Sequence, residues 1–196
     1  MRKRQRALAG ALLLSTALSV SCLSSKAFTM PEDRAQKLYE QARRDVHPDD
    51  VRRDPQSYAG TLVAWAGVVQ SAKVVQLPHG PALVLIVTHH YFDWIEDHGQ
   101  QKEIYFLSPR GEGNFVIAAP IALDRLDDAR KDAPDHVGKM LVAVGRPDAE
   151  LGAGGQIVFA SEAFVLFKDG AFRTDWIDYG RPGEPMKRVE GGMLDR

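Results

Sequence analysis

The densest group of residues that could do chemistry runs from His89 to His98 and combines histidine, aspartate and glutamate side chains. Nitrogen and oxygen ligands of these types bind Zn²⁺ in proteins. The surrounding residues predict a strand, however, and successive side chains of a strand point to opposite faces. His89 would then share a face with Tyr91 and Asp93, while His90 points the other way. We therefore predict a strand end followed by an acidic loop, with no metal site.

A second possible site consists of aromatic side chains on predicted strands, where rings can stack on sugars or bases. The candidate ligand face is formed by Tyr91, Trp94 and Tyr105. Few Lys or Arg residues lie between these aromatics, which favours packing in a core. Ligand binding on this face remains an alternative.

No motif for catalysis accompanies these residues. Nucleophilic catalysis needs an activated serine or cysteine beside a base, and the chain has no Gly-x-Ser-x-Gly elbow. The glycine-rich stretches at 111–113 and 152–155 are not followed by the Gly-Lys-Ser/Thr of a phosphate loop, so both are predicted to be turns. We predict no catalytic residues, no enzymatic activity and no cofactor.

The single cysteine, Cys22, ends an unusual N-terminal segment. Four basic residues up to Arg6 precede an apolar run of about twelve residues, and then come Ser19-Val20-Ser21-Cys22. This order is typical of a secretory signal. With a cysteine after the cut, it resembles the lipobox of bacterial lipoproteins, whose thiol is acylated and becomes the mature N-terminus. It departs from that motif at Ser19, where leucine is usual.

Two alternatives compete with a lipid anchor at Cys22. A membrane-spanning helix needs roughly 20 apolar residues, more than this run provides. Plain secretion would leave a lone thiol in an oxidising compartment. We expect a signal peptide at 1–21, a short tether at 22–30, and two or three acyl chains such as palmitate on Cys22. Leu23 in place of aspartate favours the outer membrane, facing the periplasm, over the inner membrane.

The charge of the mature chain argues against one class of partner. Removing residues 1–21 takes away four cations and leaves 21 basic and 26 acidic residues, a net charge of −5. Nucleic-acid binding is dominated by clustered Lys and Arg, so we expect no nucleic-acid partner. The expected partners are the membrane, through the anchor, and an envelope protein.

The remaining residues predict one flanking helix followed by strands. Thr29 and Glu32 fit a capping box, an apolar stripe continues to Val46, and Pro48 predicts the end of a helix over 31–47. Residues 122–133 read as a loop or a short surface helix, and residues 180–196 as a poorly ordered tail. The predicted strands cover residues 61–75, 82–94, 103–107, 115–119, 139–145 and 156–168.

These strands predict a small barrel. Short turns join them, residues 103–107 and 115–119 read as a hairpin, and Gly67 inside the first strand predicts a bulge or a sharp bend. Closure removes exposed edges, so residues 31–179 are expected to form a mostly β domain, an OB-like antiparallel barrel of five to six strands. A β-sandwich is the alternative. The side chains predicted to be buried are Val63, Trp65, Val84, Ile86, Ile104, Phe106, Val142, Val144 and Phe164.

Two segments carry a family resemblance. Residues 55–69, with Gly60, Val63-Ala64-Trp65 and Gly67, resemble the opening of the Slp (starvation-inducible) outer-membrane lipoprotein family. Residues 136–145 resemble its Gly-x-x-apolar strand that closes on glycine, and residues 157–167 its final strands. The chain departs from the family at Ala66, where glycine is usual, and at Phe167, where tryptophan is expected. The resemblance implies an outer-membrane lipoprotein with a periplasmic OB-like domain and no established enzymatic activity.

The function predicted from these features is a non-enzymatic envelope lipoprotein that binds a partner protein or supports envelope integrity. The alternative is a lipoprotein that binds a small ligand or an oligosaccharide with its strand aromatics. A soluble secreted or periplasmic protein is the alternative location.

Overall fold

The computed structural model describes residues 30–97, 102–167, 172–174, 177–178 and 187–188. The predicted signal peptide and Cys22 lie outside these residues, as do the capping residue Thr29 and all of the tether but Met30. Within the described residues, none of the helices is long and apolar enough to cross a membrane.

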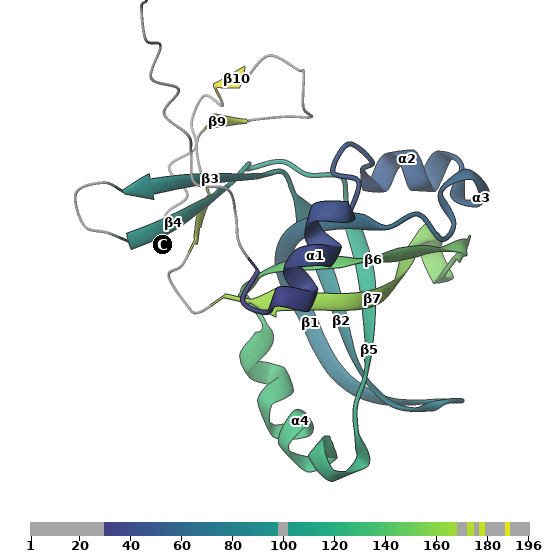
Figure 1. Ribbon diagram of the computed structural model, residues 1–196. Coiled ribbons are helices and arrows are strands. Elements are labelled where there is room, and N and C mark those ends of the chain that lie inside the picture. The colour runs from purple at the N-terminus through teal and green to yellow at the C-terminus, as the bar shows by residue number, and fades with distance from the viewer. Residues whose placement is uncertain (1–29, 98–101, 168–171, 175–176, 179–186, 189–196) are drawn as a thin grey trace, which may run out of the picture.

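Five strands close into a barrel (Figure 1). They pair in the order β1-β2-β5-β7-β6, and every pair is antiparallel except β5 with β7. This order and this single parallel pair are those of an OB-fold, so the predicted OB-like barrel is confirmed. The barrel strands are β1 (Val63–Leu77), β2 (Gly80–His90), β5 (Asn114–Pro120), β6 (Met140–Leu151) and β7 (Ile157–Leu166).

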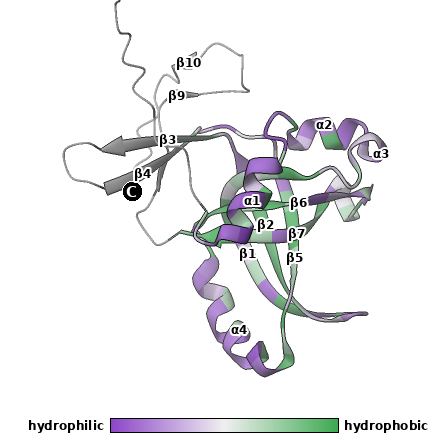
Figure 2. Cartoon of the chain, in the orientation of Figure 1, coloured by the Kyte–Doolittle hydropathy of each residue, from purple (hydrophilic) through white to green (hydrophobic). Residues whose placement is uncertain are grey.

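Aromatic rings fill the barrel interior. Trp65 is 2% exposed, and its ring centroid lies 5.2 Å from that of Phe115 and 5.1 Å from that of Phe159. The indole Nε1–H of Trp65 donates a hydrogen bond of 2.8 Å to the carbonyl oxygen of Val46, which satisfies the one polar group of the ring. Figure 2 shows the barrel strands as the most hydrophobic part of the described chain.

A second core lies outside the barrel. Helix α1 (Asp33–Gln41) places Ala35 and Tyr39 against the outer side chains of β6. The alternate side chains of β6 face the interior, so residues 140–145 are buried on both faces. This two-sided burial explains why that segment is apolar at every position.

The predicted helix over 31–47 is wrong in its extent. Helix α1 ends at Gln41, the chain runs on without a helix to His47, and Pro48 begins a new helix, α2 (Pro48–Arg53), instead of ending one. Proline favours the first helical position because its missing N–H has no partner there in any case. Helix α3 (Pro55–Tyr58) starts in the same way, with the Asp54 side chain accepting from the Ser57 N–H.

The predicted strand over 82–94 is two strands, and the predicted hairpin of 103–107 with 115–119 is wrong. After His90 the chain leaves the barrel at Tyr91 and forms β3 (Phe92–Asp97), which pairs with β4 (Lys102–Leu107). β5 returns to pair with β2. The β3–β4 hairpin is therefore an insertion between two barrel strands, and Figure 1 shows it projecting to one side.

Short elements complete the fold. The strand β8 (Phe172–Thr174) pairs in parallel with β4, and β9 (Ile177–Asp178) pairs with β10 (Lys187–Arg188), which falls within the predicted tail. The connection between β5 and β6, predicted as a loop or a short surface helix over 122–133, is helical. It consists of η1 (Leu123–Arg125), α4 (Leu126–Asp132) and η2 (Ala133–His136), and the β6–β7 connection contains η3 (Ala153–Gly155).

The predicted core is right on β1 and β6 and wrong on β2. Val63, Trp65, Val142 and Val144 are buried, and Phe164 is half-buried. On β2 the interior positions are Leu83, Leu85 and Val87, while Val84 and Ile86 are only half-buried. The side chains of Ile104 and Phe106 lie outside the described residues.

Gly67 marks a close approach of two strands. The bulge of β1 falls between Val69 and Ser71, not at Gly67 as predicted. A Cβ on Gly67 would lie 2.2 Å from the carbonyl oxygen of Thr88, so only glycine lets β2 pass at this distance.

Candidate functional site

The two adjacent histidines at the end of β2 point in opposite directions, as predicted. His89 is 3% exposed, and its ring turns towards the barrel end that α2 covers. His90 is half-buried, and its Nδ1 lies 2.8 Å from the carbonyl oxygen of Ser108. The described residues contain no group of three or more histidine, cysteine, aspartate or glutamate side chains that could hold a metal ion.

Glu112 reaches His89 because two glycines let its turn lie directly on β2. A Cβ on Gly111 would lie 1.6 Å from the carbonyl oxygen of His89. Gly113 has a φ of +70° and packs beneath the guanidinium of Arg52. Each position therefore excludes a side chain, and Glu112 between them is held at 7% exposure.

The Glu112 carboxylate joins the barrel to α2. Its Oε1 accepts a hydrogen bond from the Tyr91 hydroxyl, and its Oε2 accepts one of 2.9 Å from the backbone N–H of Asp49. Arg52 donates 2.6 Å bonds to the Glu112 carbonyl oxygen and to Asp49 Oδ1. Two of these contacts, Asp49 with Glu112 and Arg52 with Glu112, connect residues 63 and 60 positions apart in the chain.

The rings of His47, His89 and Tyr91 form a group together with Glu112. We term these four residues the end cluster. The rings meet edge to face, with centroids 5.2 Å apart for His89 and Tyr91 and 5.3 Å apart for His47 and Tyr91. The Nδ1 of His89 accepts the Glu112 N–H at 3.1 Å, which assigns the proton of the neutral ring to Nε2. Burial lowers the pKa of His89 to about 3, although the nearby Glu112 carboxylate opposes this shift.

The chemistry of the end cluster favours a structural role. A neutral, buried imidazole whose Nδ1 already accepts a hydrogen bond is poorly placed to take a proton from a substrate. The Glu112 carboxylate has both oxygens engaged within the protein. The cluster holds α2 over the barrel end, beside Val46 and Val51 of the interior core.

The predicted ligand face is divided by the structure. Tyr91 belongs to the end cluster and is half-buried. Trp94 and Tyr105 are direct cross-strand partners in the β3–β4 hairpin, and their side chains lie outside what the structure describes. Sequence reasoning treated the Gly-Glu-Gly turn as a simple hairpin turn and missed Glu112 and His47. The signal it overlooked is a carboxylate between two glycines.

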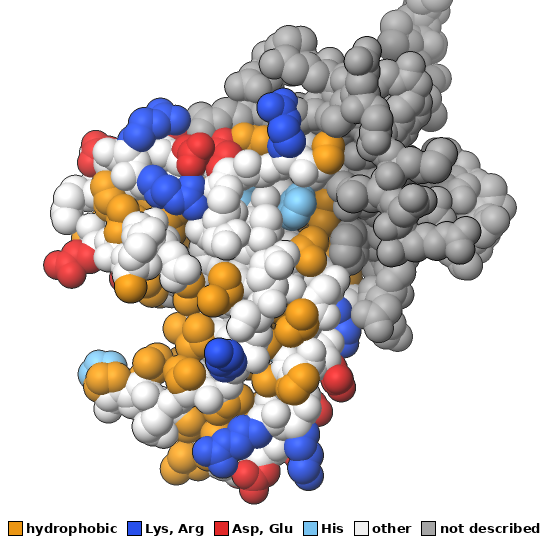
Figure 3. Space-filling view, turned by 180° about the vertical axis from the view of Figure 1, so that it is seen from behind, with side chains coloured by type: hydrophobic (Ala, Val, Ile, Leu, Met, Phe, Trp, Pro, Cys, Tyr) orange, Lys and Arg blue, Asp and Glu red, His pale blue; other side chains and the backbone are white. Residues whose placement is uncertain are grey.

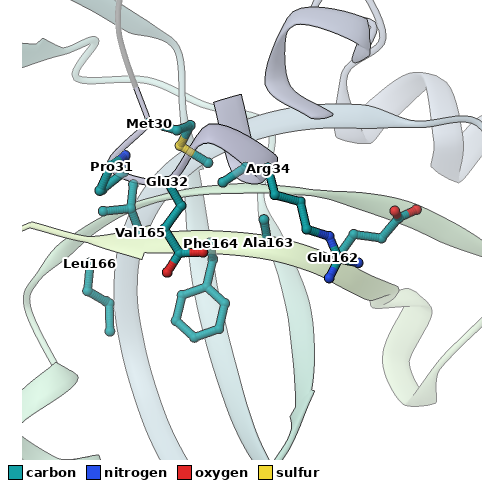
Figure 4. Close-up of a pocket in the computed structure, with 10 residues that line it drawn as sticks. Met30, Pro31, Glu32, Arg34, Glu162, Ala163, Phe164, Val165 and Leu166 are labelled. Atoms are coloured by element: carbon teal, nitrogen blue, oxygen red, sulfur yellow. The ribbon is translucent and has the colours of Figure 1, made fainter. Parts of the chain in front are cut away.

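A cavity of about 340 Å³ lies between the start of α1 and β7 (Figure 4). We term it the β7 groove. Its walls are residues 30–32 with Arg34 and Ala35 on one side, and residues 162–166 of β7 on the other. Glu162 also accepts a 2.7 Å bond from the Nε of Arg146.

Exposed hydrophobic side chains gather elsewhere. In the view opposite to that of Figure 1, they lie over the lower half of the molecule, where the β1–β2 hairpin and α4 are found (Figure 3). The large ones are Leu77, Leu123 and Val137, which are 38%, 78% and 50% exposed. Leu77 belongs to β1 and Leu123 to η1, and Val137 follows η2.

Similarity to known proteins was found among solved structures. No protein-family model matches the chain, and a search of curated proteins gives no significant match. Among solved structures, the small single-stranded DNA-binding protein from Streptomyces coelicolor is 16% identical, over 55% of this chain and 93% of its own, with a TM-score of 0.37.

Two further solved structures are similar at lower TM-scores. The single-stranded DNA-binding protein from Thermus aquaticus is 14% identical, over 57% of this chain and 53% of its own, with a TM-score of 0.31. The PriB protein from Ralstonia solanacearum is 12% identical, over 54% of this chain and 97% of its own, with a TM-score of 0.26. Because these TM-scores are below 0.5, the similarities add no evidence for the fold, which rests on the strand order described above. The DNA binding named in two of the descriptions is a property of those proteins.

Proposed function

We propose that this chain is a lipid-anchored protein of the bacterial cell envelope, similar to the Slp lipoproteins, whose barrel binds a partner protein. The anchor is supported by the signal-type segment that ends at Cys22, eight residues before Met30. Two acyl chains are needed for stable anchoring, because a single chain binds membranes only marginally. Leu23, in place of aspartate after the cysteine, supports the outer membrane as the location, with the barrel in the periplasm.

One observation supports a binding role for the outer surface of the barrel. The interior is filled by the rings of Trp65, Phe115 and Phe159, with Val51 of α2 and Ala133 of η2 in the same core. A filled barrel offers a ligand its outer surface instead of its lumen. Support of envelope integrity through a bound protein is one form that this function could take.

Fractionation and crosslinking in intact cells test the proposal. We expect the wild-type chain in the membrane fraction and the Cys22→Ser variant in the soluble fraction. A photoreactive residue in place of Lys37, an exposed position on α1, should crosslink the wild-type chain to an envelope protein. A soluble wild type, or a membrane-bound chain that crosslinks to nothing, contradicts the proposal.

A second candidate function is supported by the β3–β4 hairpin. Trp94 and Tyr105 are direct partners in the backbone pairing of β3 with β4, and a stacking platform for sugars needs aromatic residues paired in this way. A glycan array probed with the purified chain tests this function. Specific binding that is lost in Trp94→Ala would favour the ligand-binding role over the protein-binding role.

A further inference from the structure

We propose that the open edge of β7 is a docking site for an extended peptide segment of a partner protein, which adds a strand beside Phe164 and Leu166. The identity of the partner as an envelope protein rests on the proposed function. The existence of the site rests only on the geometry below.

The shape of the β7 groove shows that it lies along a strand edge. Five consecutive residues, 162–166, line the cavity. Alternate side chains of a strand point to opposite faces, so a cavity over one face would touch only every second residue. In Figure 4, Phe164 and Leu166 point away from α1, while Glu32 extends across the front of the strand. The cavity therefore runs beside the strand, next to its backbone.

The backbone of β7 presents N–H and C=O groups at this edge. The N–H of Phe167 donates to the carbonyl oxygen of Met140 at 2.9 Å, and Val165 is paired with Val142 in the same ladder. Every second residue of an antiparallel strand directs both backbone groups to the same neighbour. Phe164 and Leu166 therefore direct their N–H and C=O groups away from β6.

The opposite neighbour of β7 stops short of this region. β5 pairs with β7 only as far as Ala160. Glu162 then forms a bulge, because Ser161 pairs with Gly145 and Ala163 with Val144. Among the described strands, none pairs with residues 161–166 on the side away from β6. An extended peptide supplies the missing partner by strand addition, with its backbone as donor and acceptor.

The charges around the groove select the chemistry of the occupant. Glu162 is paired with Arg146, and Arg34 reaches towards Glu162 in Figure 4. Glu32 makes no ion pair with any described residue, and its side chain lies in front of the strand edge. The occupant is therefore an extended segment with alternating apolar side chains and a lysine or arginine beside Glu32.

The position of the groove fits a partner at the membrane. Met30 lines the groove and lies eight positions after Cys22. Eight residues span at most about 29 Å when fully extended. A chain anchored at Cys22 would thus hold the groove within reach of periplasmic segments that emerge from the membrane.

A display library of random seven-residue peptides, selected on the full mature chain purified from cells, tests the site. We expect enriched peptides with alternating apolar residues, a basic residue and no proline. Leu166→Pro should weaken their binding more than tenfold, because proline lacks the N–H that donates a hydrogen bond to a carbonyl oxygen of the peptide. Proline is tolerated where the N–H faces away from the ladder, so this variant should keep a cooperative thermal transition. The matched control Leu166→Ala keeps the N–H and should change affinity less than threefold.

Glu32 and the free amides give two further measurements. Glu32→Gln should weaken binding several-fold, while Asp33→Asn, an exposed carboxylate outside the groove, should not. In hydrogen exchange, the amides of Phe164 and Leu166 should exchange quickly in the free chain and become protected by the selected peptide. The amide of Val165 should be protected in both states.

The proposal is overturned if no peptide is enriched, if Leu166→Pro binds as tightly as the wild type, or if the Phe164 and Leu166 amides gain no protection. A concentration-dependent dimer that Leu166→Pro abolishes would instead assign the edge to a second copy of the chain. None of these outcomes depends on acylation of Cys22, so failure of the site is distinguishable from failure of the proposed function.

Discussion

Trp65 shows how one side chain can join two parts of the fold. Its ring packs between Phe115 and Phe159 inside the barrel, and its N–H reaches the carbonyl oxygen of Val46 at the barrel end. Trp65→Ala should lower the free energy of unfolding by about 3–5 kcal/mol, measured by urea denaturation.

Trp65→Phe separates packing from hydrogen bonding. It keeps most of the ring but leaves the Val46 carbonyl without its buried donor, at a cost of about 1–3 kcal/mol. Equal stability of wild type and Trp65→Ala would show that this ring is not part of the core.

His89 should make the stability of the protein depend on pH. Its pKa is about 3 in the folded protein and about 6.5 when unfolded, so between these values the unfolded chain binds more protons. The contribution of the neutral ring is therefore fully present above pH 6.5 and is lost as the pH falls towards 3. The expected loss is about 1.4 kcal/mol per pH unit within this window.

Two variants isolate this effect in urea denaturation between pH 7 and pH 4.5. His89→Gln removes the titrating ring and retains an acceptor for the Glu112 N–H, so its stability should fall less steeply with acid. His79→Gln, at the exposed tip of the β1–β2 hairpin, should keep the wild-type slope. Identical slopes in wild type and His89→Gln would contradict the assignment.

At the scale of elements, Gly67 fixes the spacing of β1 and β2. An added Cβ would lie 2.2 Å from the Thr88 carbonyl oxygen and 2.6 Å from Val87 Cγ1, so one strand must shift. Gly67→Ala should cost about 1–3 kcal/mol, seen as a lower Tm. Gly152→Ala is the matched control, since its nearest contact is a side-chain methyl at 3.2 Å, and it should change stability by less than about 1 kcal/mol. A Tm for Gly67→Ala no lower than that of the control would contradict this account.

The sequence predicts the strands better than it predicts their faces and partners. The turn residues and the long β-prone runs locate β1, β5 and β7 closely, whereas the predicted strand 139–145 misses the second half of β6, which continues to Leu151. On β2, Ala82 to Val87 are all apolar, so periodicity cannot tell whether Val84 or Leu85 faces the interior. The β3–β4 insertion is missed for a similar reason, because β2 and β3 read as one continuous run.

The end cluster is harder still to predict, because its contacts are non-local. Glu112 meets Asp49 across 63 positions, and His47 was assigned to a helix that in fact ends at Gln41. The opposite orientation of His89 and His90 follows from strand alternation alone and was predicted correctly. The elements that cover His89 are brought there by tertiary packing, which a local sequence pattern does not encode.

At the scale of the whole molecule, the barrel serves as a filled scaffold. Its interior is occupied by aromatic rings, one end is joined to α2 by Glu112, and α1 covers the outer face of β6. What remains accessible is the outer surface, including the β7 groove beside Met30. A short tether from Cys22 would hold that surface near a membrane, within reach of the envelope protein that the proposed function requires.

Mass spectrometry of the N-terminal peptide from cells that express the full chain tests the central claim most directly. The account predicts that residues 1–21 are absent and that the peptide begins at Cys22, with a mass increased by two or three acyl chains. An N-terminal peptide that begins elsewhere, or that carries an unmodified Cys22, would contradict the lipid anchor and with it the proposed place of this protein in the envelope.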